Sequence, residues 1–176
     1  MINMHFLAHV SYPYVAANLA AWIIGKPVPI EYGVAIIFFS IIPDFDYIIN
    51  IFNQLITTGK YKIPMNHHGW PSHWPIIYTP LIVASIVTGN IYVIIATIAI
   101  YIHLAMDTMF CNQGIMIFYP FNKKWYNFFS ESTKGKGGLK WNDAYSKLMI
   151  YKFDWVAFII AVIILTFKLN TVYKVI

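Results

Sequence analysis

The stretch IYVIIATIAIYIHLAMDTMF, residues 91–110, is an apolar run that holds one charged residue, Asp107, and one histidine, His103. About twenty residues of α-helix rise roughly 30 Å, which is the thickness of the hydrocarbon core of a bilayer. The whole chain has the same character, since it is 59% hydrophobic and 11% charged, with a mean hydropathy of +0.61. Soluble domains carry about 25% charged residues. The stretch and the composition together predict an integral membrane protein.

Four more apolar segments lie on either side of this stretch. The third and fifth of the five are short, and we expect each to be a half-span or an interfacial helix. Their apolar runs are continuous rather than alternating, which favours helices over barrel strands. The predicted fold is all-α: a polytopic helical membrane protein with four to five transmembrane or half-spanning helices, in one integral membrane domain over residues 1–176. In chain order the segments are residues 6–24, 33–52, 75–87, 91–110 and 155–167.

Residues 111–153 differ from the rest because charged residues return there, among scattered Trp, Tyr and Phe. Aromatic side chains of this kind prefer the headgroup layer, so we expect an aromatic-rich loop on the membrane surface. With five spans, nine of the twelve lysines fall on one face and three on the other. The positive-inside rule places the lysine-rich face in the cytoplasm.

Charge and cysteine content narrow the kinds of partner and site. The formal net charge is +5, but the lysines are spread along loops. They fit topology signals and contacts with anionic membrane lipid, and we expect no nucleic acid partner. The single cysteine, Cys111, excludes an internal disulfide and a cysteine-rich zinc motif. Any bound metal must therefore use histidine and carboxylate ligands.

Asp44 and Asp46 lie two residues apart inside an apolar run, directly after Pro43. Ionisable groups are costly inside a membrane and are functional candidates by default. The proline can kink the helix and redirect both acids. The alternative is that the two acids only cap a helix that restarts after the proline, because Asp is a favourable N-cap residue.

His103 and Asp107 have i, i+4 spacing, which puts both side chains on one face of a helix, one turn apart. Such a pair can bind one cation or bridge two. The alternative is a hydrogen-bonded pair that only fixes helix packing.

The stretch NHHGWPSH, residues 66–73, supplies three histidines between the second and third apolar segments. Imidazoles beside Gly and Pro, which fix a turn, suit zinc or a similar divalent ion, although a pH-sensitive surface loop is an alternative. His5 and His9, at the start of the first segment, are also spaced i, i+4, and His9 is the better candidate. Histidines near a membrane interface without a ligand role are the alternative for that pair.

The predicted topology provides a joint test of these motifs as one site. Nothing in their individual spacing requires them to lie on the same side of the membrane. With five spans, every motif falls at the lysine-rich face, which predicts one shared metal site there. The candidate ligands exceed the four of a closed zinc site, so one or two ions, most simply Zn²⁺, fit equally well. The candidates are His9, Asp44, Asp46, His68, His73, His103 and Asp107.

These motifs, in their order along the chain, resemble the YdjM-like membrane-bound metal-dependent hydrolases of bacteria and archaea. The matching elements are PDFD (43–46), HHGWPSH (67–73), HLAMD (103–107), and Gly114 followed by YPF (119–121), over about residues 9–124. One departure is Gly69, where the family often has a basic residue. The resemblance implies a prokaryotic inner or plasma membrane and a remote relation to the zinc-dependent phospholipase C and nuclease group. It also implies metal-site roles for Asp44, Asp46, His68, His73, His103 and Asp107.

The leading functional hypothesis is a phospholipase-like hydrolase in which a bound divalent metal lowers the pKa of a water and polarises the scissile group. Asp44 or Asp46, if not a ligand, is the expected general base. A site at a membrane face suggests a lipid or phosphoester substrate, with Lys123 and Lys124 holding its anionic headgroup.

Two other classes remain open. Intramembrane Asp and His also build ion pathways, but a transporter needs polar residues on both sides of the site, and the far halves of these segments are almost wholly apolar. A non-catalytic membrane protein with a structural metal is the third class, and a closed site without exchangeable water would support it.

Overall fold

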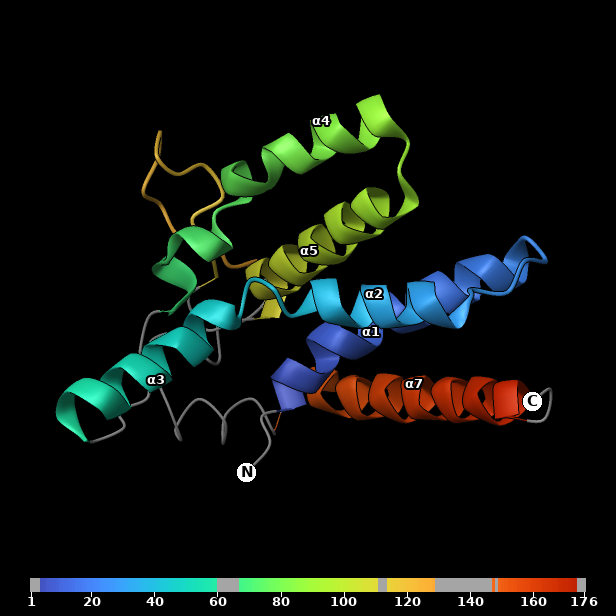
Figure 1. Cartoon of the computed structure of the whole chain (residues 1–176). Helices are drawn as coiled ribbons and strands as arrows, with labels where there is room; N and C mark the ends of the chain where they lie inside the picture. The colour runs from blue at the N-terminus through green and yellow to red at the C-terminus, as the bar shows by residue number, and fades with distance from the viewer. Residues whose placement is uncertain (1–3, 60–66, 111–113, 129–146, 148, 174–176) are drawn as a thin grey trace.

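A computed structural model of the chain describes residues 4–59, 67–110, 114–128, 147 and 149–173. These residues form helices and turns, which confirms the all-α prediction (Figure 1). The elements are α1 (Met4–Ile23), α2 (Ile30–Ser40), α3 (Phe45–Thr58), the short 3₁₀ turns η1 (His67–Gly69), η2 (Pro71–His73) and η3 (Pro75–Tyr78), α4 (Thr79–Thr88), α5 (Ile91–Phe110) and α7 (Met149–Tyr173).

The predicted count of four to five transmembrane or half-spanning helices is not confirmed. Within the described residues, two helices are long and apolar enough to cross a bilayer, at residues 91–109 and 151–171. A third span exists only if α2 and α3 count as one broken span, and η3 with α4 forms a shorter apolar helix. In an 18-residue apolar window of residues 151–171 only 11% of the residues are buried inside the protein, against 44% in the corresponding window of residues 91–109. The central helix is therefore α5, and α7 lies at the lipid-facing edge.

The second predicted segment, residues 33–52, is two helices rather than one. After Ser40 the chain forms tight turns, in which the amide of Asp44 donates to Ile41 O (3.1 Å) and that of Phe45 to Ile42 O (3.1 Å). Pro43 stands in this break and has no N–H to continue a helical ladder. The axes of α2 and α3 differ by 55°, which confirms the predicted kink.

Gly25 and Gly89 each follow the end of a helix and have positive φ. Gly25 (φ 69°) follows α1, and Gly89 (φ 58°) joins α4 to α5 as a tight hairpin. Positive φ is accessible to glycine at no steric cost, so both helices stop there.

The fifth segment is longer than predicted, because α7 extends from Met149 past both ends of residues 155–167.

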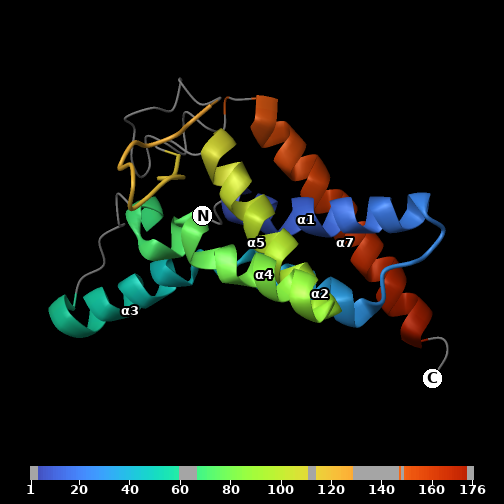
Figure 2. The same cartoon turned by 90° about the horizontal axis from the view of Figure 1, so that it is seen from above.

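The helices pack as a bundle in which α1 contacts α7 and α2, and α2 contacts α5 (Figures 1 and 2). Gly33 allows the close approach of α1 and α2, since a Cβ there would lie 2.9 Å from the Tyr14 ring. At the far end of α7, Lys168 Nζ donates to Val28 O (2.6 Å) and ties that helix to the turn between α1 and α2.

Of the predicted surface loop, residues 114–128, 147 and 149–153 are described, and residues 149–153 belong to α7 rather than to a loop. The rest of the predicted loop lies outside the described residues. Ile115 and Tyr126 pair in an antiparallel bridge through two backbone hydrogen bonds of 3.2 and 2.9 Å. Gly114 has φ 70°, and a Cβ on it would overlap the Tyr126 carbonyl oxygen. Only glycine fits at this position.

Candidate metal centre

All seven predicted ligand positions meet at one end of the bundle. They come from the first turns of α1, the break between α2 and α3, the turns η1 and η2, and the second half of α5 (Figure 1). The ring of His9 stacks on that of His103 with centroids 3.9 Å apart, and the ring of His73 lies near both His68 and His103. Segments far apart in sequence thus build one cluster.

The carboxylate of Asp107 lies at the centre of four histidines. Its Oδ1 is 3.2 Å from His9 Nε2 and 3.7 Å from His68 Nε2. Its Oδ2 is 3.2 Å from His103 Nε2 and 3.5 Å from His73 Nε2. All four rings therefore turn the same nitrogen, Nε2, toward one buried carboxylate.

A hydrogen bond to a backbone carbonyl fixes the orientation of the His103 ring. Its Nδ1 lies 2.7 Å from Ser40 O, and because a carbonyl only accepts, Nδ1 must carry the hydrogen. The Nε2 lone pair of the neutral ring then faces the cluster. Metal-binding histidines usually have this arrangement, in which the other ring nitrogen donates to a carbonyl or carboxylate.

Asp44 occupies the N-cap position of α3 but makes no capping hydrogen bond with its side chain. Its Oδ1 lies instead 3.5 Å from His73 Nε2 and 3.7 Å from His103 Nε2. The simple capping interpretation of this acid is therefore wrong, because the carboxylate faces the histidines.

Asp46 faces the Nδ1 atom of His73, on the side of the ring away from the cluster of Nε2 atoms. Its Oδ2 lies 3.5 Å from His73 Nδ1 and accepts a hydrogen bond of 2.7 Å from Ser72 Oγ, which itself lies 3.2 Å from the same Nδ1. This geometry suits a carboxylate that orients a ligand histidine. Asp46 belongs to neither of the compact ligand groups found among the described residues.

Those compact groups are His9, Asp44 and His103, and His68, His73 and Asp107, with the offered ligand atoms of each within 4.8 Å of one another. Around a tetrahedral zinc with bonds of about 2.0–2.1 Å, neighbouring ligand atoms lie roughly 3.3–3.4 Å apart. The contacts of 3.2–3.7 Å in the cluster bracket that spacing. The donor set therefore fits one or two divalent ions, and Asp107 touches both groups.

The side chains of the cluster differ in burial, so the cluster is open to solvent on one side. The side chains of His73, His103 and Asp107 are fully buried, while Asp44 and His68 keep 14% and 13% of their surface exposed. Burial lowers the pKa of His73, but hydrogen bonds with Asp44 and Asp46 outweigh it and raise this pKa to about 10. A metal bound by His73 must therefore displace a proton.

Aromatic side chains hold the histidine-bearing turns in place. Tyr78 Oη donates to Ser72 O (2.8 Å), and Trp74 Nε1 donates to Gly69 O (3.2 Å). The Trp74 ring stacks on Tyr119, centroids 3.7 Å apart, so the YPF motif packs against this turn.

The departure at Gly69 also has a structural explanation. A Cβ on Gly69 would lie 3.1 Å from the Trp125 ring, which leaves little room for the basic side chain that the family often has.

Lys123 and Lys124 lie outside the cluster, at exposed positions of residues 114–128. The Lys124 ammonium lies over the Tyr126 ring, 5.5 Å from its centroid. The side chains of His5 and His67 lie outside the described residues.

Sequence reasoning missed three residues in or near the site. Ser40 contributes a backbone carbonyl, which no side-chain pattern can indicate, and Ser72 acts through Asp46. Asp154, 1% exposed on α7, accepts a hydrogen bond from Tyr12, one turn after His9. Asp154 could have been noticed in the sequence as an acid at the start of an apolar helix. It lies one residue before the predicted segment 155–167.

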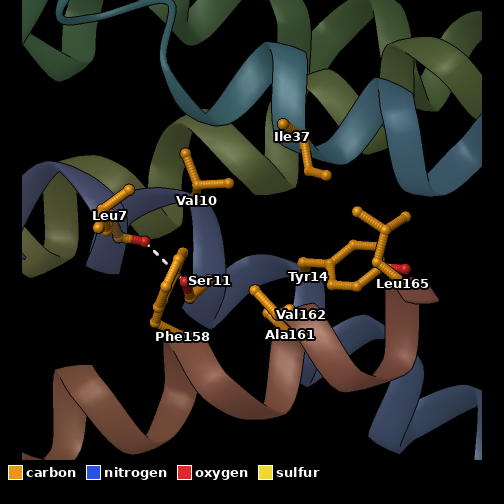
Figure 3. A pocket seen from close by; sticks show the side chains of 9 residues that line it. All are labelled: Leu7, Val10, Ser11, Tyr14, Ile37, Phe158, Ala161, Val162 and Leu165. Carbon is orange, nitrogen blue, oxygen red and sulfur yellow. Dashed lines mark hydrogen bonds between the residues drawn. The ribbon is translucent and has the colours of Figure 1, made fainter. Parts of the chain in front are cut away.

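A separate cavity of about 100 Å³ lies between α1, α2 and α7 (Figure 3). Its lining is apolar, with Val10, Ile37 and Phe158 among the side chains drawn, and the Ser11 hydroxyl donates to Leu7 O (2.7 Å). This cavity lacks the groups needed for catalysis and is not the candidate site.

Comparison with known proteins supports the resemblance drawn from the motifs. No curated protein and no solved structure matches the chain. Residues 4–175, nearly the entire chain, match a protein family described as YdjM inner membrane protein. The chain therefore belongs to the YdjM inner membrane protein family.

Proposed function

We propose that the protein is a membrane-bound, metal-dependent hydrolase that acts on a phosphoester of a lipid. The observation that carries this proposal is the convergence of four histidine Nε2 atoms on Asp107, with Asp44 Oδ1 beside two of them, at distances typical of atoms that share a divalent cation. When bound, such an ion lowers the pKa of a water toward neutrality and polarises the phosphoryl group.

The chain's own residues divide into three roles under this proposal. The ligand set is His9, His68, His73, His103 and Asp107. Asp46, with the help of Ser72, orients His73. Asp44 is the best candidate for the general base, because its carboxylate faces the ligands and is one of the two partly exposed members of the cluster.

Partial exposure also favours catalysis over a purely structural metal. A structural site is closed by protein ligands, whereas a catalytic site keeps a position open for water or substrate. Asp44 and His68 form the exposed side of the cluster, and a substrate phosphate would enter past them. The lipid substrate follows from the location of the cluster at one end of a lipid-embedded bundle, and Lys123 and Lys124 are available to an anionic headgroup.

Transport is less well supported, because the inner face of α5 beyond the cluster is filled with apolar side chains. Ala96, Ala99 and Ile100 are buried there, with 2–5% exposure. This leaves little polar lining for an ion that would continue through the bundle.

The test is metal analysis followed by a hydrolysis screen on the purified protein in nanodiscs. The substrates are a phosphatidic acid, a phosphatidylglycerol and a soluble aryl phosphate, and the variants are Asp44→Asn and His103→Ala. Glu31→Gln, which changes an exposed acid at the other end of α2, is the matched control.

We expect stoichiometric metal in the wild type and the control, less metal in His103→Ala, and turnover lost in both site variants. Failure of the metal-replete wild type to bind metal would refute the site. Metal without turnover of any substrate would instead favour the structural alternative.

A further inference from the structure

Helix α3 stands apart from the bundle. It leaves the end of α2 at 55° and projects away from the other helices (Figures 1 and 2). Its fourteen residues rise about 21 Å, which is less than the roughly 30 Å of a hydrocarbon core. It is thus too short to be a membrane span of its own.

The residues of α3 divide cleanly around the helix axis. At 100° per residue, the apolar side chains fall on one half of the helix and the amides and hydroxyls on the other. The apolar half is well exposed, with Ile49 and Phe52 each at 61% and Ile56 at 81%. The apolar half comprises Phe45, Ile48, Ile49, Ile51, Phe52, Leu55 and Ile56, and the polar half Asp46, Tyr47, Asn50, Asn53, Gln54, Thr57 and Thr58.

The polar half contains the side chain that joins α3 to the metal centre. Asp46 is buried against His73 and Ser72, so this half is turned toward the turns η1 and η2 at the start of the helix. Further along, Gln54 Nε2 donates to Asn50 Oδ1 (2.6 Å) and Thr57 Oγ1 to Asn53 O (2.7 Å). The apolar half consequently points away from the protein.

We infer that α3 is an interfacial helix whose apolar half lies in the bilayer at the boundary between headgroups and acyl chains. Three observations select lipid as the occupant of this face. The helix starts where α2 ends, at the same end of the bundle as the last turns of the spanning helix α5 (Figure 1). Its polar half of amides and hydroxyls suits the headgroup layer. Lys60 and Lys62 follow Gly59 in the sequence and are complementary to anionic headgroups.

This placement has a consequence for the metal centre, although it does not depend on the proposed function. Asp44 and Asp46 lie at the first turn of α3, so a helix held in the interface also holds these acids at headgroup depth.

The test is a depth profile of α3 by spin labelling in vesicles of phosphatidylcholine and phosphatidylglycerol. Single cysteines are introduced in a Cys111→Ser background at Ile49, Phe52 and Ile56 on the apolar half, and at Asn53 and Thr57 on the polar half. All five positions are exposed, so the substitutions leave the packing of the bundle intact. A label at Ile163, an exposed position in the middle of α7, marks the depth of the hydrocarbon core.

We expect the three apolar positions to favour collision with oxygen, at a similar shallow depth of about 5–10 Å. The polar positions should favour collision with a water-soluble nickel chelate, and Ile163 should be deeper than all of them. Chelate access at every α3 position would overturn the inference, as would a depth that increases steadily from residue 49 to residue 57. Dipolar broadening between labels at Ile56 would show that a second copy of the chain covers this face, which would also overturn it.

Discussion

The position of Asp107 makes it the most informative residue to change. Both of its oxygens are used, each toward two histidine nitrogens at 3.2–3.7 Å. Asp107→Asn keeps the size of the side chain but removes its charge and one of its two acceptor oxygens. If the cluster binds metal, this single change weakens every ligand group at once.

The size of the effect follows from these contacts. Removing a group that only orients a ligand typically costs 10–100-fold in metal affinity. Asp46 has that orienting geometry, since it contacts His73 and Ser72 alone among the cluster residues described above. We therefore expect a 10–100-fold loss for Asp46→Asn and more than about 100-fold for Asp107→Asn, which is about 2.8 kcal/mol or more at 1.4 kcal/mol per tenfold.

The assay is a competition titration of the purified, reconstituted protein against a zinc chelator, with bound metal counted by elemental analysis. Glu31→Gln is the matched control and should bind as the wild type does. Circular dichroism checks that each variant keeps its helices. The reasoning fails if folded Asp107→Asn binds metal within threefold of the wild type, or if Asp46→Asn loses more affinity than Asp107→Asn.

Three further predictions test the surroundings of the centre. Ser72→Ala removes the hydroxyl that holds the orienting carboxylate and should weaken metal binding about 10–100-fold in the same titration, whereas Ser85→Ala, which alters a hydroxyl in α4, should not. Gly114→Ala should lower the midpoint of thermal unfolding more than Gly25→Ala, because both have φ near 70° but only a Cβ at Gly114 meets neighbouring atoms; equal shifts would contradict this. Because the pKa of His73 is raised to about 10, metal must displace a proton near neutral pH, so affinity should rise up to tenfold per pH unit between pH 6 and 8 for each proton displaced. Calorimetry in buffers of different ionisation enthalpy should detect the released proton, and a pH-independent affinity without proton release would refute the assignment.

Much of the cluster was predictable because its residues are chemically out of place in their segments. Asp44, His103 and Asp107 interrupt apolar runs, and such groups are rare unless a partner stabilises them. The i, i+4 spacing of His103 and Asp107 placed both on one helix face, and the structure has them 3.2 Å apart. Ser40 and Ser72 were not predictable, because Ser40 contacts the cluster through its backbone carbonyl and Ser72 contacts it through the side chain of Asp46.

The division of residues 33–52 between two helices was not predictable from hydropathy. Hydropathy cannot separate a helix that crosses the membrane from two shorter helices joined at a bend, because both have the same average composition. Residues 33–52 were predicted as one apolar segment. In the structure the chain breaks around Pro43, and these residues belong to two helices, α2 and α3, whose axes differ by 55°. The amphipathic pattern of α3 was present in the sequence, but it became meaningful only once the helix was known to begin at Phe45.

The sequence by itself determined the membrane environment, the helical class and the chemistry of the candidate ligands. These properties follow from composition and from local spacing, which depend on few neighbours. Only the tertiary structure decided which ligands face one another, that Asp107 is central and that Asp46 stands behind His73. Those relations depend on how α1, α3, α5 and the histidine turns pack, and the direction in which each side chain points is set by contacts between segments that lie up to about one hundred residues apart.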